Sequence, residues 1–340
     1  MPMVKGKMAF MLALGLCITT FLLGCNNGRA TEPVAKEPET TAQSSNTSEQ
    51  KYEKTDEESM TEHGGSFDFE AKAVTLNNGY EMPIIGIETW MLDDDTAENA
   101  VYHALKDGYR LIDTARYYGN AVGIQNGVKR AIEEGTVSRE EIFITTKIVP
   151  YGFDDYSAAI EECNEALGLG YIDLMLIHQQ GADEIELYRA IENAIDDKIV
   201  RSLGISNYYA EEDFARVTEG ARIMPCIIQN ENHPYYQNTD FQQYVSQYGI
   251  IIESYYSFGG RGHTQDLFGD ETIVKIAETH NITSAQVLLR WQLQAGYIAI
   301  PGSGNPDHIA ENFDIFDFEL SDGEMSEIAD MNTGERYESW

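Results

Sequence analysis

The chain has 340 residues, of which 42% are hydrophobic and 11% aromatic, and this composition excludes a wholly disordered protein. Its 23 Lys and Arg residues face 57 Asp and Glu residues, which gives a formal net charge of −34 at pH 7. Residues 73–340 carry −30 of this charge, so the acidity belongs to the folded part of the chain. An acidic surface repels phosphate backbones, so we expect no nucleic-acid partner, and a soluble, non-adhesive surface is the simpler reason for the charge.

The first residues have the pattern of a signal peptide. Lys5 and Lys7 precede an apolar run over 8–23, which is shorter than the about 20 residues that span a bilayer. The run ends in Leu-Leu-Gly-Cys at 22–25, a string that resembles the lipobox of bacterial lipoproteins. That resemblance implies removal of residues 1–24, acylation of Cys25, and a lipid anchor on the extracytoplasmic face of a bacterial cell membrane. An ordinary signal peptide with an incidental cysteine is the alternative.

Residues 25–70 are predicted to be a disordered acidic linker, because they are rich in Thr, Ser, Glu and Lys and have almost no apolar side chains. Of the four cysteines, Cys17 would leave with the signal peptide, and only Cys163 and Cys226 lie in the body of the chain. Cys163 has the spacing of a buried helix face. The sequence therefore predicts neither a disulfide framework nor a metal site.

Residues 71–340 repeat a strand followed by a helix. Two short extended runs around Asn77-Asn78-Gly79 predict a hairpin over 71–83. Apolar runs predict strands at 84–88, 110–113, 142–146, 172–177, 200–205, 226–229, 250–255 and 297–301. Amphipathic segments predict helices at 95–107, 121–134, 155–168, 184–196, 210–219, 240–247, 270–295 and 306–315.

Eight such strand–helix units predict an α/β fold, a (β/α)8 TIM barrel with an N-terminal hairpin. A doubly wound sheet is the alternative, but no G-x-G-x-x-G turn follows the first strand. Barrel active sites lie at the carboxyl ends of the strands. The residues at these ends are polar or aromatic: Thr89-Trp90, Asp113, Lys147, His178, Ser206-Asn207, Gln229, Tyr255 and Gly302-Ser303.

Four of the residues near the strand ends predict a reductive chemistry. Tyr118 follows Asp113 by five residues, and a phenol with a pKa of about 10 is a poor acid at neutral pH. An ammonium such as that of Lys147 lowers a phenol pKa, and a carboxylate keeps the lysine charged and in place. Tyr118 can then protonate a carbonyl oxygen while hydride arrives at carbon, with His178 bound to the same oxygen. We therefore expect carbonyl reduction by a bound nicotinamide.

The chain resembles the aldo-keto reductase family throughout residues 71–335. The resemblance rests on GYRLIDTARYYGNAVGIQNGVKRAI…IFITTK (108–147), DLMLIH (173–178), GISNY (204–208), IIQNENHPY (227–235), LLRWQLQ (288–294) and IPGSGNPDHIAENFDIFDFEL (300–320). It implies a catalytic tetrad of Tyr118, Lys147, Asp113 and His178, with Tyr118 as proton donor. It also implies a monomer that takes a small-molecule carbonyl substrate, with Trp90 and His178 at the substrate.

The same resemblance implies NADPH as cofactor, with the carboxamide held by Ser206, Asn207 and Gln229 and the nicotinamide ring stacked on Tyr255, although Tyr256 competes for that role. The cofactor contacts that it implies are Thr89, Trp90, Ser206, Asn207, Gln229, Tyr255, Gly302, Ser303, His308, Glu311 and Asn312.

The chain departs from the family pattern at several positions. Gly302 and His308 stand where the family often has Lys and Arg, the two cations that grip the 2′-phosphate of NADPH. We therefore expect a reduced preference for NADPH, and use of NADH as well. Glu88 occupies a usual glycine position and adds a negative charge beside the cofactor cleft, and Gln179-Gln180 replace the common Trp-Pro after the catalytic histidine.

Two other functions remain open from the sequence. The first is a non-catalytic, nicotinamide-binding surface lipoprotein or redox sensor on the same barrel, because free cofactor is scarce outside the cytoplasm. The complete tetrad speaks against it. The second is a lyase or hydrolase, for which the sequence lacks the paired carboxylates or metal ligands that such chemistry needs.

Overall fold

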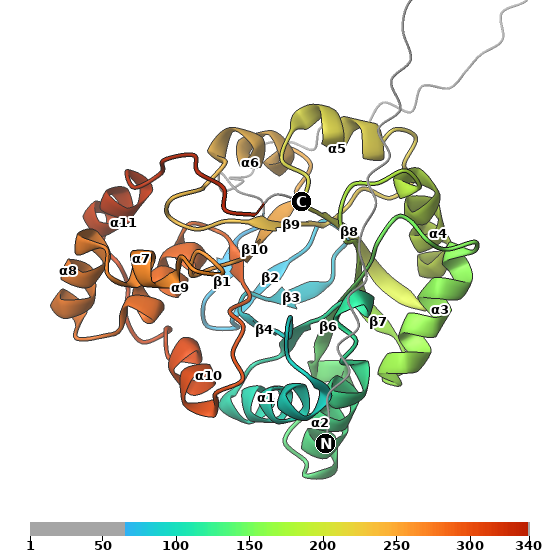
Figure 1. Ribbon diagram of the computed structural model, residues 1–340, viewed down its shortest axis with the longest axis horizontal. Helices are drawn as coiled ribbons and strands as arrows, with labels where there is room; N and C mark the ends of the chain where they lie inside the picture. Colours follow the sequence, from blue (N-terminus) through green and yellow to red (C-terminus); the bar gives the residue numbers. More distant parts are fainter. Residues whose placement is uncertain (1–64, 339–340) are drawn as a thin grey trace, which may run out of the picture. The chain divides into compact units, whose positions relative to one another are not determined.

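A computed structural model describes residues 65–338, all of which belong to one compact unit. Its central feature is a barrel of eight parallel strands surrounded by helices (Figure 1), which confirms the predicted (β/α)8 fold. The predicted signal peptide, Cys25 and nearly all of the predicted linker lie outside the described residues. Within residues 65–338, no helix combines the length and the apolar character that crossing a membrane requires.

The barrel strands follow one another in chain order around the sheet. They are β4 (Gly86–Glu88), β5 (Leu111–Asp113), β6 (Phe143–Ile148), β7 (Ile172–Ile177), β8 (Val200–Ser206), β9 (Ile227–Glu231), β10 (Ile251–Tyr255) and β11 (Ile298–Ala299). Two parallel bridges, Ile85 to Ala299 and Glu88 to Gly302, join the last part of the sheet to the first. Buried Ile, Leu and Val side chains of the strands pack against the helices, as expected for parallel strands covered on both sides.

The helices lie around the outside of the barrel (Figure 1). They are α1 (Asp94–Asp107), α2 (Ala121–Glu133), α3 (Tyr156–Leu167), α4 (Glu184–Asp196), α5 (Glu211–Val217), α6 (Thr239–Ser246), α7 (Thr264–Phe268), α8 (Glu271–His280), α9 (Ser284–Gln294), α10 (Pro306–Phe313) and α11 (Asp322–Ala329). Two short 3-10 helices are η1 (Arg116–Tyr118) and η2 (Arg139–Glu141).

The predicted hairpin is present and lies at the amino-terminal end of the barrel. It consists of β2 (Ala73–Thr75) and β3 (Glu81–Pro83), and β1 (Phe67–Asp68) adds a third antiparallel strand. The side-chain amide of Asn78 in its turn donates to Ser202 Oγ over 2.9 Å, near the start of β8. The hairpin therefore covers the end of the barrel opposite to the predicted site.

The predicted single helix over 270–295 is wrong, because the structure has two helices there. Asn281 adopts a left-handed conformation with φ 55° and ends α8, and its backbone N–H donates to the carbonyls of the last turn. Thr283 then starts α9 with a capping box, in which its hydroxyl accepts from the N–H of Gln286 and the Gln286 side chain accepts from the N–H of Thr283. The sequence analysis also missed the short helices α7 and α11.

The last described residues return to the carboxyl end of the barrel. The backbone N–H groups of Tyr337 and Glu338 donate to the carboxylate of Glu231, over 2.6 and 2.9 Å. The Tyr337 ring stacks on His263 with ring centroids 3.7 Å apart, and on His233 with centroids 5.0 Å apart. We call residues 336–338 the C-terminal clasp.

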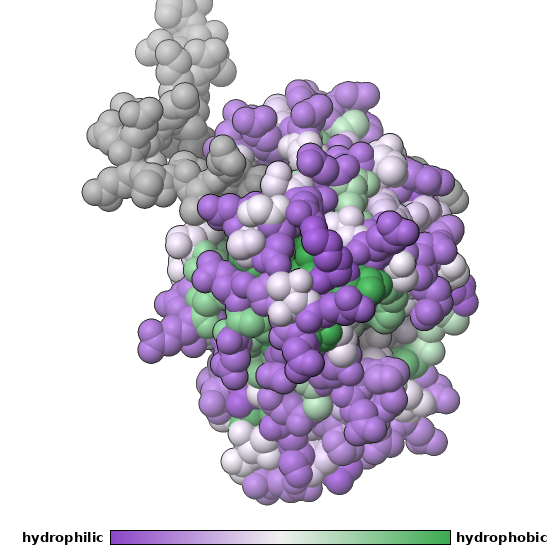
Figure 2. Space-filling model, turned by 90° about the vertical axis from the view of Figure 1, so that its left-hand side faces the viewer, coloured by the Kyte–Doolittle hydropathy of each residue, from purple (hydrophilic) through white to green (hydrophobic). Residues whose placement is uncertain are grey.

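The surface is polar on the face described next, as the many charged residues predict, and the two cysteines of the barrel lie inside it. The face seen in Figure 2 is mostly hydrophilic, and its hydrophobic residues occupy small areas. Cys163 on α3 and Cys226 before β9 are both free and buried, with side chains 5% and 1% exposed.

Candidate active site

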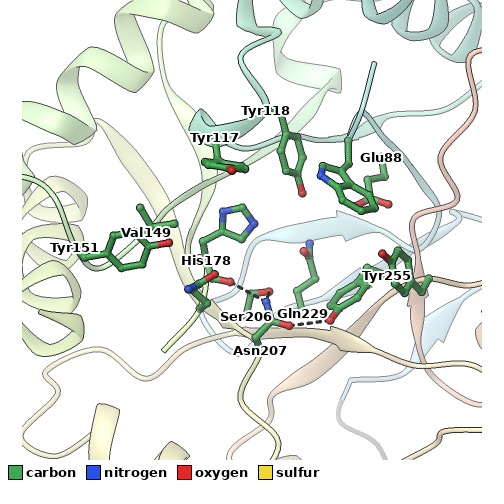
Figure 3. Close-up of a pocket in the computed structure, with 13 residues that line it drawn as sticks. Glu88, Tyr117, Tyr118, Val149, Tyr151, His178, Ser206, Asn207, Gln229 and Tyr255 are labelled. Atoms are coloured by element: carbon green, nitrogen blue, oxygen red, sulfur yellow. Dashed lines mark hydrogen bonds between the residues drawn. The ribbon is translucent and has the colours of Figure 1, made fainter. Parts of the chain in front are cut away.

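The carboxyl ends of the barrel strands surround a pocket of about 830 Å³, including its open mouth. Side chains from four of the strands, β4, β8, β9 and β10, and from segments that follow the strands form its wall (Figure 3). These residues are Glu88, Trp90, Tyr117, Tyr118, Val149, Tyr151, His178, Gln179, Ser206, Asn207, Gln229, Tyr255 and Tyr256.

Lys147 organises the bottom of this pocket. Its ammonium forms a buried ion pair with Asp113, and it also donates to the carbonyl of Thr114 over 3.0 Å and to Tyr118 Oη over 3.2 Å. Three acceptors therefore match the three N–H groups of the ammonium. Lys147 and Asp113 are 1% and 0% exposed, whereas Tyr118 is only partly buried and lines the pocket. The structure thus brings Asp113, Tyr118 and Lys147 into one connected group, as the sequence predicts.

His178 follows β7 and lies beside Tyr118. The two rings meet edge to face, with centroids 5.8 Å apart. Burial, together with the Lys147 ammonium, lowers the pKa of His178 to about 3, so this imidazole is neutral at physiological pH. Its Nδ1 is buried and has no hydrogen-bond partner within the described residues. A neutral imidazole on the pocket wall suits a hydrogen bond to an uncharged oxygen.

The electrostatics of Tyr118 differ from the sequence prediction. Burial raises the pKa of Tyr118 well above 10, and the nearby Glu88, Asp113 and Glu253 raise it further. The predicted lowering by Lys147 is therefore not the net effect in this structure. The physical reason is that burial disfavours the charged phenolate, and negative charge on the neighbouring carboxyl groups acts in the same direction.

A polar corner of the pocket faces the flat ring of Tyr255. Asn207 is held in a left-handed conformation with φ 65°, and its amide nitrogen donates to the carbonyl of His178 over 2.9 Å. The Tyr255 hydroxyl donates to Asn207 Oδ1 over 2.8 Å (Figure 3). Ser206 lies next to them, its Oγ 3.2 Å from the Asn207 amide nitrogen. The predicted residues Ser206, Asn207 and Tyr255 are therefore neighbours.

Gln229 also lines this corner, but its amide nitrogen is already engaged. It donates to Asp113 Oδ2 over 2.8 Å and to Glu253 Oε2 over 2.7 Å. Gln229 thus bridges the carboxyl group of the predicted tetrad to a second buried carboxyl that the sequence analysis did not single out. The alternation along β10 carried that signal, because Glu253 shares the inward face with Tyr255.

Thr89 and Trp90 follow β4 on the other side of the pocket. The Thr89 hydroxyl is buried and donates to the carbonyl of Asp113 over 3.0 Å, so it does not line the pocket. Trp90 does line it, and its ring lies 5.9 Å from that of Tyr256 and 5.3 Å from the Arg261 guanidinium. Tyr256 itself lies 5.1 Å from the Tyr255 ring, so both tyrosines stand at the pocket.

The remaining predicted cofactor residues lie outside the pocket wall, at and beside α10. Gly302 is exposed and bridges to Glu88. Ser303 Oγ accepts from the N–H of Asn305, Glu311 accepts from the Thr283 hydroxyl, Asn312 is buried, and His308 is exposed. This second group presents no lysine or arginine of its own.

Several wall residues are absent from the sequence predictions. Tyr117 and Tyr151 are 77% and 46% exposed and flank the pocket mouth with Val149. Val149 and Tyr151 lie in the loop after β6, and Tyr117 lies in the short 3-10 helix η1. Periodicity does not predict the course of such segments, although Tyr117 directly precedes Tyr118. Within residues 65–338, no three or more His, Cys, Asp or Glu side chains cluster in a way that suits a metal ion.

Comparisons with known proteins agree on one family. The model of the Aldo/keto reductase family matches residues 84–333. An NAD(P)H-dependent D-xylose reductase of Candida tropicalis is 34% identical over 303 residues, which cover 78% of this chain and 93% of that protein.

Solved structures give the same result. An aldo-keto reductase from a deep-sea metagenome library has a TM-score of 0.73 at 37% identity, covering 78% of this chain and 97% of that chain. An aldo-keto reductase of Bombyx mori in complex with NADP has a TM-score of 0.72 at 31% identity, covering 78% and 94% of the two chains.

Proposed function

Because the chain belongs to the aldo/keto reductase family, we propose that Tyr118 donates the proton when the barrel-mouth pocket reduces an aldehyde or ketone. The predicted reaction, NAD(P)H-dependent carbonyl reduction, is confirmed by the family match and by relatives that use these cofactors. The observation that carries the assignment of the acid is the contact of Tyr118 Oη with Lys147 Nζ at the pocket wall.

The pocket residues fit a nicotinamide cofactor. A flat amide-bearing ring needs an aromatic face and polar groups at its edge, and Tyr255 lies next to the side chains of Ser206 and Asn207. The pocket, with a volume of about 830 Å³ including its open mouth, leaves room beside these side chains. When bound, the cofactor supplies a hydride to the carbonyl carbon.

The proton is handled by the chain itself. Tyr118 gives its hydroxyl proton to the carbonyl oxygen, and the phenolate that remains is stabilised by the Lys147 ammonium 3.2 Å away. Asp113 keeps Lys147 charged and fixed. His178, neutral and beside Tyr118, orients the carbonyl oxygen by a hydrogen bond.

Tyr118→Phe tests this proposal, because it removes one oxygen and retains the ring. We expect carbonyl reduction to fall by about 10²–10⁴, the usual contribution of a positioned acid. Cofactor binding, followed by Trp fluorescence during titration with NADPH or NADH, should be preserved because Ser206, Asn207 and Tyr255 are unchanged. Unchanged reduction in the variant would refute the assignment. A wild type that binds cofactor yet reduces no carbonyl would instead support a sensor.

We further propose that the chain is a lipoprotein anchored to the extracytoplasmic face of a bacterial membrane through Cys25. The support is the sequence alone: a short apolar run after Lys5 and Lys7 that ends in Leu-Leu-Gly-Cys. Two or more acyl chains would hold the protein stably, since each buried CH₂ contributes about 0.8 kcal/mol.

Detergent-phase partitioning tests the anchor. The wild type should enter the detergent phase, and Cys25→Ala should move to the aqueous phase or keep its signal peptide. Cys17→Ala is the matched control and should behave as the wild type does. A wild type found in the aqueous phase would rule out the anchor.

A further inference from the structure

Glu88 is a pocket residue that the reaction as described does not use. It is the last residue of β4, and it stands in register with Asp113 on the neighbouring parallel strand β5. In a barrel, residues at matching register positions point to the same side of the sheet. Glu88 is only partly buried and lines the pocket, and Figure 3 shows it and His178 on opposite sides of the Tyr118 phenol.

The charge of Glu88 interacts with two further carboxyls, those of Asp113 and Glu253. Asp113 is joined through the Gln229 amide to Glu253, which is fully buried and has one oxygen, Oε1, without a hydrogen-bond partner among the described residues. Lys147 is the cation in direct contact with one of these three carboxyls, that of Asp113. Its three N–H groups are taken by Asp113, Thr114 and Tyr118, so the other two carboxyls receive no hydrogen bond from it.

Lys147 donates a hydrogen bond to neither Glu88 nor Glu253, so both carboxyls are costly to ionise at this place and hold their protons at neutral pH. Burial raises the pKa of Glu88 to about 8, with Asp113 adding to the rise and Lys147 opposing it. Burial likewise raises the pKa of Glu253 to about 8. The two differ in access, because Glu253 is closed off from the pocket whereas Glu88 opens onto it.

We propose that Glu88 controls the acidity of Tyr118 and thereby sets the alkaline limit of carbonyl reduction. While Glu88 keeps its proton it adds no negative charge beside the phenolate that forms when Tyr118 gives up its proton, and the Lys147 ammonium stabilises that phenolate from 3.2 Å away. Once Glu88 ionises, its negative charge opposes Lys147 and disfavours that phenolate, so proton donation slows. Glu88 is a positioning residue in this sense: it acts through Tyr118 and not on the substrate.

The charged groups around Glu88 support this direction of its effect on Tyr118, in which ionised Glu88 makes the phenol a weaker acid. Asp113 and Lys147 face it from β5 and β6, Glu253 from β10, and Tyr256 from the loop after β10. Arg261 lies over the Trp90 ring, 5.3 Å from its centroid, and its charge acts on Tyr256. Burial of the phenol raises the pKa of Tyr118, and a negative charge on Glu88 raises it further. Ionisation of Glu88 therefore changes the acidity of the Tyr118 phenol.

The test is the pH profile of reduction of a neutral aldehyde, with each enzyme normalised to its own rate at pH 7. The proposal rests on the reductase activity, so the full chain is used with saturating NADPH. In the wild type we expect kcat to fall at least tenfold between pH 7 and pH 9.5, with KM for the aldehyde changing less than threefold. Glu88→Gln and Glu88→Ala should both lose this fall.

Two variants serve as controls, one for the loss of a negative charge and one for the other carboxyls near Glu88. Glu278→Gln changes an exposed residue of α8 that does not line the pocket, and it should keep the wild-type profile. Glu253→Gln should also keep an alkaline fall, because Glu88 remains.

Three outcomes would overturn the proposal: a wild type with a flat profile from pH 7 to 9.5, Glu88 variants with the wild-type profile, or loss of the fall in Glu253→Gln alone. A wild type that is inactive at every pH would overturn the proposed function together with this inference, so the two failures are distinguishable.

Discussion

Lys147 has a structural role as well as an electrostatic one. Its three donors reach Asp113, the Thr114 carbonyl and Tyr118, which come from β5, the following turn and η1. The ammonium therefore fixes the position of the phenol relative to the strand on which Asp113 lies. An arginine has a planar, forked head and does not reproduce these three directions. The position of Tyr118 at the pocket thus depends on a lysine in this place.

Gly302 and His308 lead to a prediction about cofactor choice. The group of residues at α10 presents no lysine or arginine, and His308 is exposed. Each missing charge-assisted contact to a phosphate is worth about 1.5–3 kcal/mol, so the preference for NADPH over NADH should be small. Gly302→Lys with His308→Arg should increase that preference by tens- to hundreds-fold.

Steady-state kinetics with both cofactors measure this preference as a ratio of kcat/KM values. Ser326→Lys, which adds a cation at an exposed position of α11, is the control for net charge and should leave the ratio unchanged. A wild-type preference above a thousandfold would mean that other groups hold the phosphate.

At the scale of elements, the sequence predicted the barrel and most of the pocket, because both follow from local patterns. A strand places its last residues at the mouth of the barrel whatever its partners are, so the periodicity of the sequence was enough to place Asp113, Lys147 and His178 there. Periodicity could not predict the break between α8 and α9, since that break depends on one left-handed residue, Asn281, inside a helical pattern. Strand alternation indicates that Glu253 faces inward, but only the fold shows that it meets Gln229, so the sequence analysis did not single it out.

The C-terminal clasp was likewise beyond sequence analysis, because Tyr337 and Glu231 are 106 positions apart. It leads to a prediction about stability. Glu231 is 1% exposed and accepts two backbone N–H groups from the clasp, besides contacting His233 Nε2 over 2.9 Å. Ending the chain after Glu335 removes both donors, each of which contributes about 1.5–3 kcal/mol to a charged acceptor.

We therefore expect the unfolding temperature of this truncated chain to fall by several degrees, at about 2–4 °C per kcal/mol for a domain of this size. A chain ending after Glu338 keeps both donors and is the matched control. Equal unfolding temperatures for the two truncations would show that the clasp does not stabilise the barrel.

At the scale of the whole molecule, the buried carboxyls make stability depend on pH. Burial raises the pKa of Glu253 from 4.5 to about 8, so the folded state binds this proton more tightly than the unfolded state does. Its contribution to the free energy of unfolding is complete below pH 4.5 and is lost as the pH rises to 8. A glutamine at position 253 does not titrate, so it makes no such pH-dependent contribution.

Glu253→Gln should therefore gain stability relative to the wild type as the pH rises from 5.5 to 8.5. Thermal unfolding of both proteins at several pH values measures the difference, in which the contributions of groups that do not interact with Glu253 cancel. A difference that stays constant over this range would contradict the prediction.

The burial of Cys163 and Cys226 gives the barrel an internal reporter of its own opening. Neither thiol is accessible in the folded state, so a thiol-reactive dye can label them only in molecules that have opened transiently. The two sites lie in different parts of the barrel, on α3 and just before β9, and their labelling rates separate local fluctuation of one part from opening of the whole. Equal rates at both positions would mean that the barrel opens as a single cooperative unit, whereas unequal rates would reveal which side loosens first.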